Sequence, residues 1–166
     1  MPVPDQRDPE VTLAKLTGWL DGHLPGARIP VLDTPATSGF SNETLMFEAE
    51  WNDPDDGRPR HGTFVARVAP NRYQLFPEPR FEEQYRLLRI LDRETGIPVP
   101  PIHWYEPSPE ILGAPFFVME RVDGRVPTDM PPYHTDGWVT EIAPDERAAM
   151  WWSALEILAR VHRLDV

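Results

Sequence analysis

The chain has 166 residues, a formal net charge of −11 and no cysteine. Its length fits one ordinary domain or two small lobes, and its acidic surface disfavours binding to nucleic acid or to an anionic membrane surface. Without cysteine the protein cannot form disulfides, zinc–cysteine sites or a thiol nucleophile, a composition that fits a cytoplasmic protein.

Hydrophobic periodicity and turn residues predict the elements of the first half of the chain. Residues 1–10 are polar and proline-rich, show no signal-peptide pattern and are expected to form a flexible tail. Apolar side chains at helical spacing predict a helix over residues 11–24. A short strand is expected over residues 29–32. Clean alternation predicts a hairpin of strands 44–51 and 62–68 around an acidic turn.

The second half predicts two helices and two further strands. An apolar stripe predicts a helix over residues 81–94, and a short strand is expected over 102–105. Residues 115–122 are almost continuously apolar, so this strand should be buried on both faces of a sheet. A proline-rich, irregular stretch over 126–142 leads into a last helix over 145–164. No apolar run approaches the roughly 20 residues that span a bilayer.

The order of these elements predicts an α+β fold in which an antiparallel sheet carries a helix on one face. The last helix follows a break at Asp123-Gly124 and is expected to begin a second lobe. Its apolar stripe, which includes Trp151, Leu155 and Leu158, is expected to be buried, and His162 at the end of that stripe is expected to be a buried histidine.

Four features of the sequence occur in an informative order. A small, hydroxyl-rich loop, residues 39–42, precedes a strand, although such a loop alone is more often a plain hairpin turn. Alternation places Val65 and the cation Arg67 on one face of the next strand. The helix over 81–94 has polar residues near its start, and the buried strand ends at a glycine break.

These features resemble the small lobe of the protein-kinase-like fold, and in detail the aminoglycoside phosphotransferase and choline kinase superfamily. The segments that carry the resemblance are GFSNET, PVPPIHWYE, LGAPFFVMERVDGRVP and LARVH. They are most similar to bacterial phosphotransferase family proteins, whose relatives include kinase-like domains fused to some acyl-CoA dehydrogenases. The resemblance implies a nucleotide-binding lobe of about five antiparallel strands plus a helix over residues 11–122. A hinge and the first helix of a helical C-terminal lobe would follow over 123–166.

The resemblance implies ATP as the cofactor and a role for residues of the loop and of the following strand. Gly39, Phe40, Ser41 and Asn42 match the nucleotide-positioning loop, in which Ser41 and Asn42 would form the tip. Arg67 matches the strand cation that holds the α- and β-phosphates, and arginine offers a two-pronged donor there. Val65 would form part of the floor of the adenine pocket.

Further positions match the back of the adenine pocket, the hinge and the helix. Met119 matches the residue at the back of the pocket, and the main chain of Glu120 and Val122 matches the hinge that pairs with adenine. Relatives often place a glutamate where this chain has Gln84. Either Gln84 bonds to Arg67, or Glu83 rotates towards it, or no pair forms.

No HGD-like catalytic loop and no later metal-binding aspartate occur in these 166 residues. The resemblance therefore implies the ATP-binding lobe of a phosphotransferase that transfers the γ-phosphoryl group to a small-molecule hydroxyl, and this chain is expected to be inactive alone. Mg²⁺ would be held only with the absent C-terminal lobe, which, or another partner, could dock on an exposed face. The alternative is a non-catalytic module that binds a nucleotide or a protein.

Overall fold

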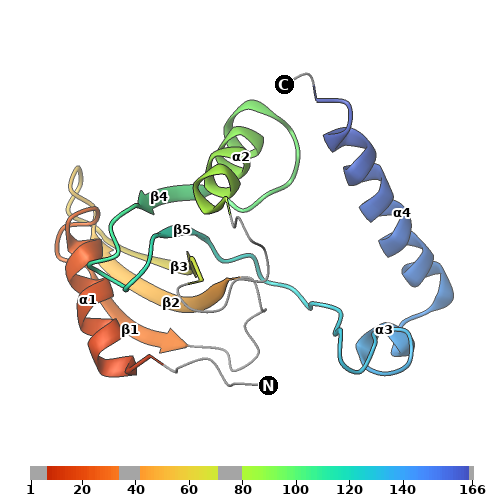
Figure 1. Cartoon of the computed structure of the whole chain (residues 1–166), viewed down its shortest axis with the longest axis horizontal. Coiled ribbons are helices and arrows are strands. Elements are labelled where there is room, and N and C mark those ends of the chain that lie inside the picture. The colour runs from red at the N-terminus through yellow and green to blue at the C-terminus, as the bar shows by residue number, and fades with distance from the viewer. Residues whose placement is uncertain (1–6, 34–41, 71–79, 165–166) are drawn as a thin grey trace. The chain divides into compact units, whose positions relative to one another are not determined.

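The computed structural model describes residues 7–33, 42–70 and 80–164, which belong to two compact units. The first unit comprises residues up to 94 together with 99–121, and the second comprises 95–98 together with the residues from 122 onwards. The elements of the first unit are α1 (Pro9–Asp21), β1 (Arg28–Asp33), β2 (Glu43–Asn52), β3 (Pro59–Val68), α2 (Phe81–Glu94), β4 (Ile102–Glu106) and β5 (Phe116–Glu120) (Figure 1). The second unit contains α3 (Trp138–Glu141) and α4 (Pro144–Val161).

The five strands form one sheet in the order β1-β2-β3-β5-β4, and every neighbouring pair is antiparallel. This confirms the predicted α+β fold. The hairpin of β2 and β3 closes at Gly57, whose φ of 68° suits a residue without a side chain. The amide of Gly57 donates to the carbonyl of Asp53 at 2.8 Å, and the Asp53 carboxylate accepts from the amide of Asp55.

The alternation of side chains divides the sheet into two faces, named here after the helices that pack on them. On the α1 face, Leu16 and Leu20 of the helix join buried residues of β2, β3 and β5 in the main core. On the α2 face, Phe81 and Tyr85 of α2 pack with Phe117 of β5. The main core of buried strand and loop residues comprises Ala27, Ile29, Leu45, Phe47, Ala49, Phe64, Ala66, Val68, Leu112, Ala114, Phe116 and Val118.

Strand β5 is buried on both faces, as its apolar sequence predicts. Phe116 and Val118 point into the main core, while Phe117 between them points towards α2. All three side chains are at most 2% exposed. β5 ends at Glu120, two residues before the predicted end, because the chain leaves the sheet where its apolar run stops.

Helix α1 begins at Pro9, two residues before its predicted start, because residues of the expected tail cap it. The Asp8 carboxylate accepts from the amides of Glu10 (2.9 Å) and Val11 (3.2 Å), and proline at the first helical position has no amide that needs a partner. Residues 7–10 are therefore held in place, although the sequence suggested a flexible tail.

A histidine in an aromatic environment, His23, follows the end of α1. The His23 ring stacks on Trp104 at 5.1 Å between centroids and meets the edge of Trp19 at 4.5 Å. Burial lowers the pKa of His23 below its ordinary value of 6.5, and the nearby carboxylate of Glu106 offsets part of this effect. Protonation of His23 therefore disfavours the packing of α1 on the sheet.

A pH-dependent loss of stability is expected from His23. Because its pKa is lower in the folded than in the unfolded chain, its contribution is fully present above about 6.5 and is lost as the pH falls from there through the folded pKa. Urea unfolding measured across this pH range should show that the free energy of unfolding declines less in His23→Gln than in the parent chain. An identical decline in both proteins would contradict this assignment.

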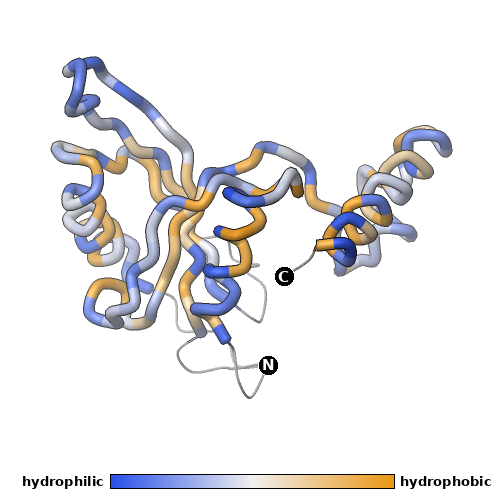
Figure 2. Tube along the Cα trace, turned by 90° about the horizontal axis from the view of Figure 1, so that it is seen from above, coloured by the Kyte–Doolittle hydropathy of each residue, from blue (hydrophilic) through white to orange (hydrophobic). Residues whose placement is uncertain are grey.

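The apolar stripe of α4 is exposed, contrary to the prediction that it is buried. No residue of α4 is buried, and Trp151, Trp152, Leu155 and Leu158 are 46–70% exposed; Figure 2 shows apolar positions along this helix. His162 is exposed as well. Helical periodicity identifies an apolar face, but it does not reveal whether another segment covers that face. Within the described part of the chain, none of the helices is long and apolar enough to cross a membrane.

The irregular stretch before α4 is ordered by an arginine and a tryptophan. The Arg125 guanidinium lies over the Trp138 ring at 4.4 Å from its centroid. The Trp138 indole also donates to the carbonyl of Val126 at 3.3 Å. Trp138 begins the four-residue helix α3, which the sequence did not predict because a single turn carries too little periodicity.

Candidate functional site

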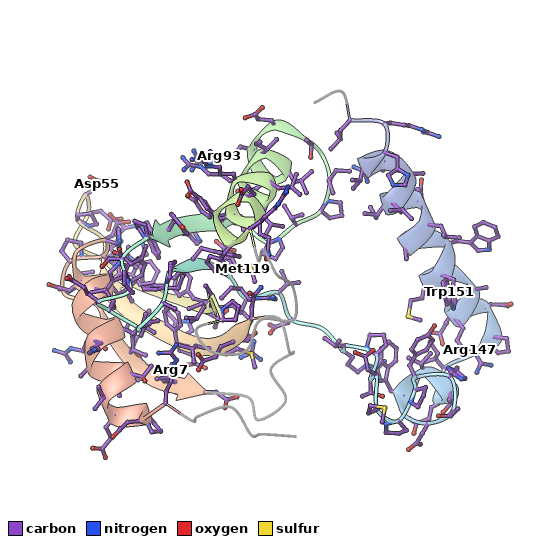
Figure 3. All side chains as sticks on the ribbon, in the orientation of Figure 1. Arg7, Asp55, Arg93, Met119, Arg147 and Trp151 are labelled. Carbon is purple, nitrogen blue, oxygen red and sulfur yellow. The ribbon has the colours of Figure 1, made fainter. Side chains whose placement is uncertain are left out.

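A row of half-buried apolar side chains crosses the centre of the α2 face. Strand register pairs Val65 of β3 with Met46 of β2 on one side and with Met119 of β5 on the other. All three side chains are partly accessible, and Met119 is labelled in Figure 3. Adjacent strands lie about 4.8 Å apart, so this apolar row (Met46, Val65 and Met119) spans roughly the width of a planar ring system.

Arg67 lies in the next row of the same face, about 7 Å further along β3 than Val65. Its register partners are Thr44 and Phe117. The alternating burial of β3 confirms that Val65 and Arg67 share one face, as predicted. Burial lowers the pKa of the Arg67 guanidinium below its usual value, but arginine stays cationic at neutral pH. A partly desolvated cation attracts an anion more strongly than one in open water.

Asn42 and Gln84 connect the start of β2 to α2. The Asn42 amide nitrogen donates to the side-chain oxygen of Gln84 at 3.3 Å. Asn42 is only 6% exposed and directly precedes β2, and its role in the nucleotide-positioning loop stays a prediction. A buried amide needs hydrogen-bond partners, and this bond holds α2 beside the strand that carries Thr44. The predicted contact of Gln84 or Glu83 with Arg67 stays a prediction.

The chain leaves the sheet at the two predicted hinge positions. The Glu120 amide donates to the carbonyl of Pro101, and the Arg121 amide donates to the carbonyl of Thr63, both at 2.9 Å. The side chain of Glu120 reaches His103, with 3.4 Å between carboxylate oxygen and Nε2. Val122 belongs to the second unit and is 68% exposed. Their roles towards adenine stay predictions.

Arg7 supports the beginning of β2, a contribution that the sequence did not reveal. Its Nε lies 2.5 Å from a carboxylate oxygen of Glu43, and it also donates to the carbonyl of Leu112. Arg7 and Glu43 are 36 residues apart, so no local pattern could predict their contact. The predicted loop residues Gly39, Phe40 and Ser41 lie outside the described residues.

A hollow of the first unit lies elsewhere and shares none of its lining residues with the apolar row or Arg67. It has a volume of about 440 Å³ and runs along α2, lined by Tyr85, Arg86, Arg89, Ile90, Arg93 and Glu94. Arg86 is already paired with Glu82 at 2.5 Å, and Arg89 donates to the Tyr85 hydroxyl. Arg86 and Arg89 are thus engaged within α2 itself.

Comparison with known proteins identifies the family. Residues 34–166 match the phosphotransferase enzyme family. The chain belongs to this family. The match includes the apolar row, Arg67 and both helices of the second unit.

A solved structure shows the same fold for this member of the phosphotransferase family. It is a protein of Ralstonia eutropha that is classed with the aminoglycoside phosphotransferases. The two chains superpose with a TM-score of 0.59 at 23% identity, over 92% of this chain and 38% of the other. The five-stranded antiparallel sheet with its helices is thus the N-terminal lobe of a protein-kinase-like fold, as predicted.

Curated relatives of this phosphotransferase-family chain are much longer proteins. Acyl-CoA dehydrogenase family member 11 is 28% identical in Rattus norvegicus over 93% of this chain, and 28% identical in Homo sapiens over 91%. Family member 10 of Mus musculus is 24% identical over 99% of the chain. The chain spans 14–18% of the length of these relatives.

Proposed function

We propose that the first unit binds ATP on the α2 face of its sheet, as the nucleotide-binding lobe of a phosphotransferase. In the longer proteins of the family, the γ-phosphoryl group would pass to a hydroxyl of a small molecule. The observation that carries this proposal is the position of Arg67, one row from a partly accessible apolar row on the same face. Membership of the phosphotransferase family supports it.

The two rows suit the two halves of a nucleotide. The apolar row offers Val65 and Met119 to the adenine ring, which gains from apolar contact on its face. Arg67 offers a cation with several N–H donors to the phosphate oxygens, and such charge-assisted bonds are among the stronger contacts in proteins. The bond between Asn42 and Gln84 holds α2 beside the start of β2, next to Thr44, the register partner of Arg67.

We assign nucleotide binding, and not turnover, to these 166 residues. ATP supplies the phosphoryl group, and bound Mg²⁺ neutralises charge during its transfer. The sequence carries no segment that resembles the family's catalytic loop. Arg67, the apolar row and the main chain at Glu120 would therefore hold and orient the nucleotide, while the catalytic base and the metal ligands would come from the helical lobe.

Thermal unfolding with and without nucleotide tests this proposal. A ligand that binds only the folded chain raises the midpoint of unfolding in a saturable manner. ATP with Mg²⁺ at millimolar concentration is expected to raise the midpoint, whereas tripolyphosphate at the same ionic strength should raise it less because it cannot contact the apolar row. No shift with ATP, or equal shifts with both compounds, would contradict nucleotide binding.

A further inference from the structure

The second unit contains a small hollow whose lining comes from three consecutive segments. Its volume is about 120 Å³. The lining consists of Tyr133 and His134 from the loop before α3, Val139 and Thr140 from α3, and Arg147 and Trp151 from α4. Val139 is buried at 5% exposure and forms an apolar floor. Arg147 and Trp151, both labelled in Figure 3, lie one helical turn apart on α4.

Arg147 is a half-buried cation without a partner among the residues that the structure describes. Its guanidinium makes no hydrogen bond, ion pair or ring contact with any residue of 7–33, 42–70 or 80–164. By contrast, Arg125 lies over Trp138, and Arg160 donates to the carbonyl of Gly96. A cation that has lost part of its hydration, without gaining a bond in return, favours an anion at its side.

The remaining lining fits an anion better than a cation. The Tyr133 hydroxyl and the Trp151 indole are donors that make no hydrogen bond to residues 7–33, 42–70 or 80–164. The Thr140 hydroxyl donates to the carbonyl of Gly137 at 2.7 Å and is thus already engaged. No carboxylate lines the hollow. A carboxylate or phosphate group accepts hydrogen bonds only, and its size suits this volume, whereas pockets for drug-sized ligands span about 300–1,000 Å³.

We propose that this hollow binds the oxyanion group of a small molecule, a carboxylate or a phosphate. Arg147 is its principal donor, and Tyr133 and Trp151 complete the site. The site is distinct from the proposed nucleotide site, because all of its residues belong to the second unit. It also stands independently of ATP binding, so failure of one assignment leaves the other in place.

The indole N–H resonances of the full 166-residue chain provide a direct readout of binding. Inorganic phosphate and acetate are titrated separately at constant ionic strength with sodium chloride, and the Trp151 signal is assigned from its loss in Trp151→Phe. We expect a saturable shift of the Trp151 indole with at least one anion. A response to phosphate alone assigns a phosphate site, a response to acetate alone assigns a carboxylate site, and a response to both assigns a general oxyanion site.

Variants decide whether Arg147 is the donor. Arg147→Gln should weaken anion affinity by about tenfold or more, since bonds to charged groups are the stronger ones. Arg163→Gln removes the same charge from an exposed position and should leave the affinity unchanged. Tyr133→Phe removes one donor and should weaken binding several-fold even if Arg147→Gln disturbs folding. The proposal would be overturned if the Trp151 signal of the parent chain showed no saturable shift. It would also be overturned if Arg147→Gln and Arg163→Gln lost the same amount of anion affinity.

Discussion

Replacement of Phe116 by alanine is expected to lower the free energy of unfolding of the first unit by about 3–5 kcal/mol. The Phe116 side chain is fully buried, and its ring lies 4.7 Å from that of Trp19 on α1. Its removal leaves a cavity at the point where the helix meets the sheet. Small domains are stable by only about 5–15 kcal/mol, so this loss would remove a large share of the total.

Urea unfolding followed by far-ultraviolet circular dichroism measures this loss. Leu87→Ala serves as a matched control, because Leu87 lies on the exposed side of α2 and is 53% exposed. Its cost should be below about 1 kcal/mol, as expected for a surface position. If Phe116→Ala and Leu87→Ala destabilised the protein equally, Phe116 would not be the central contact of the main core.

Replacement of Arg67 by glutamine is expected to weaken ATP binding by roughly 10- to 100-fold, because hydrogen bonds to charged groups contribute about 1.5–3 kcal/mol. Glutamine keeps a polar side chain in the half-buried position but removes the charge. Binding of adenosine, which has no phosphates, should change little. The selective loss of phosphate recognition is the expected signature of a cation that faces the phosphate chain.

Calorimetric titration of both ligands into the parent chain and Arg67→Gln provides the measurement. Arg58→Gln is the matched control, since it removes the same charge from the hairpin tip, where the Arg58 side chain is 77% exposed. ATP affinity should be unchanged in this control. If ATP binding weakened equally in both variants, the cause would be the change in net charge. If the ATP affinity of Arg67→Gln were unchanged, Arg67 would not belong to the site.

The fold of the first unit was predictable because its signals are local. The bounds of α2, Phe81–Glu94, agree with the prediction, since an apolar stripe fixes the helix and Gly96 and Pro98 oppose its continuation. The burial of Phe116 and Phe117 on opposite faces follows from an uninterrupted apolar run. The shared face of Val65 and Arg67 follows from the two-residue period of a strand.

The parts that were not predictable depend on contacts between distant residues. The bond from Asn42 to Gln84 and the pair of Arg7 with Glu43 join segments 42 and 36 residues apart. The exposure of Trp151 depends on what covers α4, which its own periodicity does not contain. For the same reason the sequence did not bring together the lining of the hollow around Arg147, because a loop and two helices supply it.

Methyl resonances of the five methionines test the central claim most directly, namely that ATP binds on the α2 face. Met46 and Met119 belong to the apolar row, whereas Met130 and Met150 lie in the second unit. With methyl-¹³C-methionine in the full chain, ATP with Mg²⁺ should shift the Met46 and Met119 signals saturably and leave those of Met130 and Met150 in place. Unmoved Met46 and Met119 signals at millimolar ATP, or shifts confined to Met130 and Met150, would contradict the proposed nucleotide site.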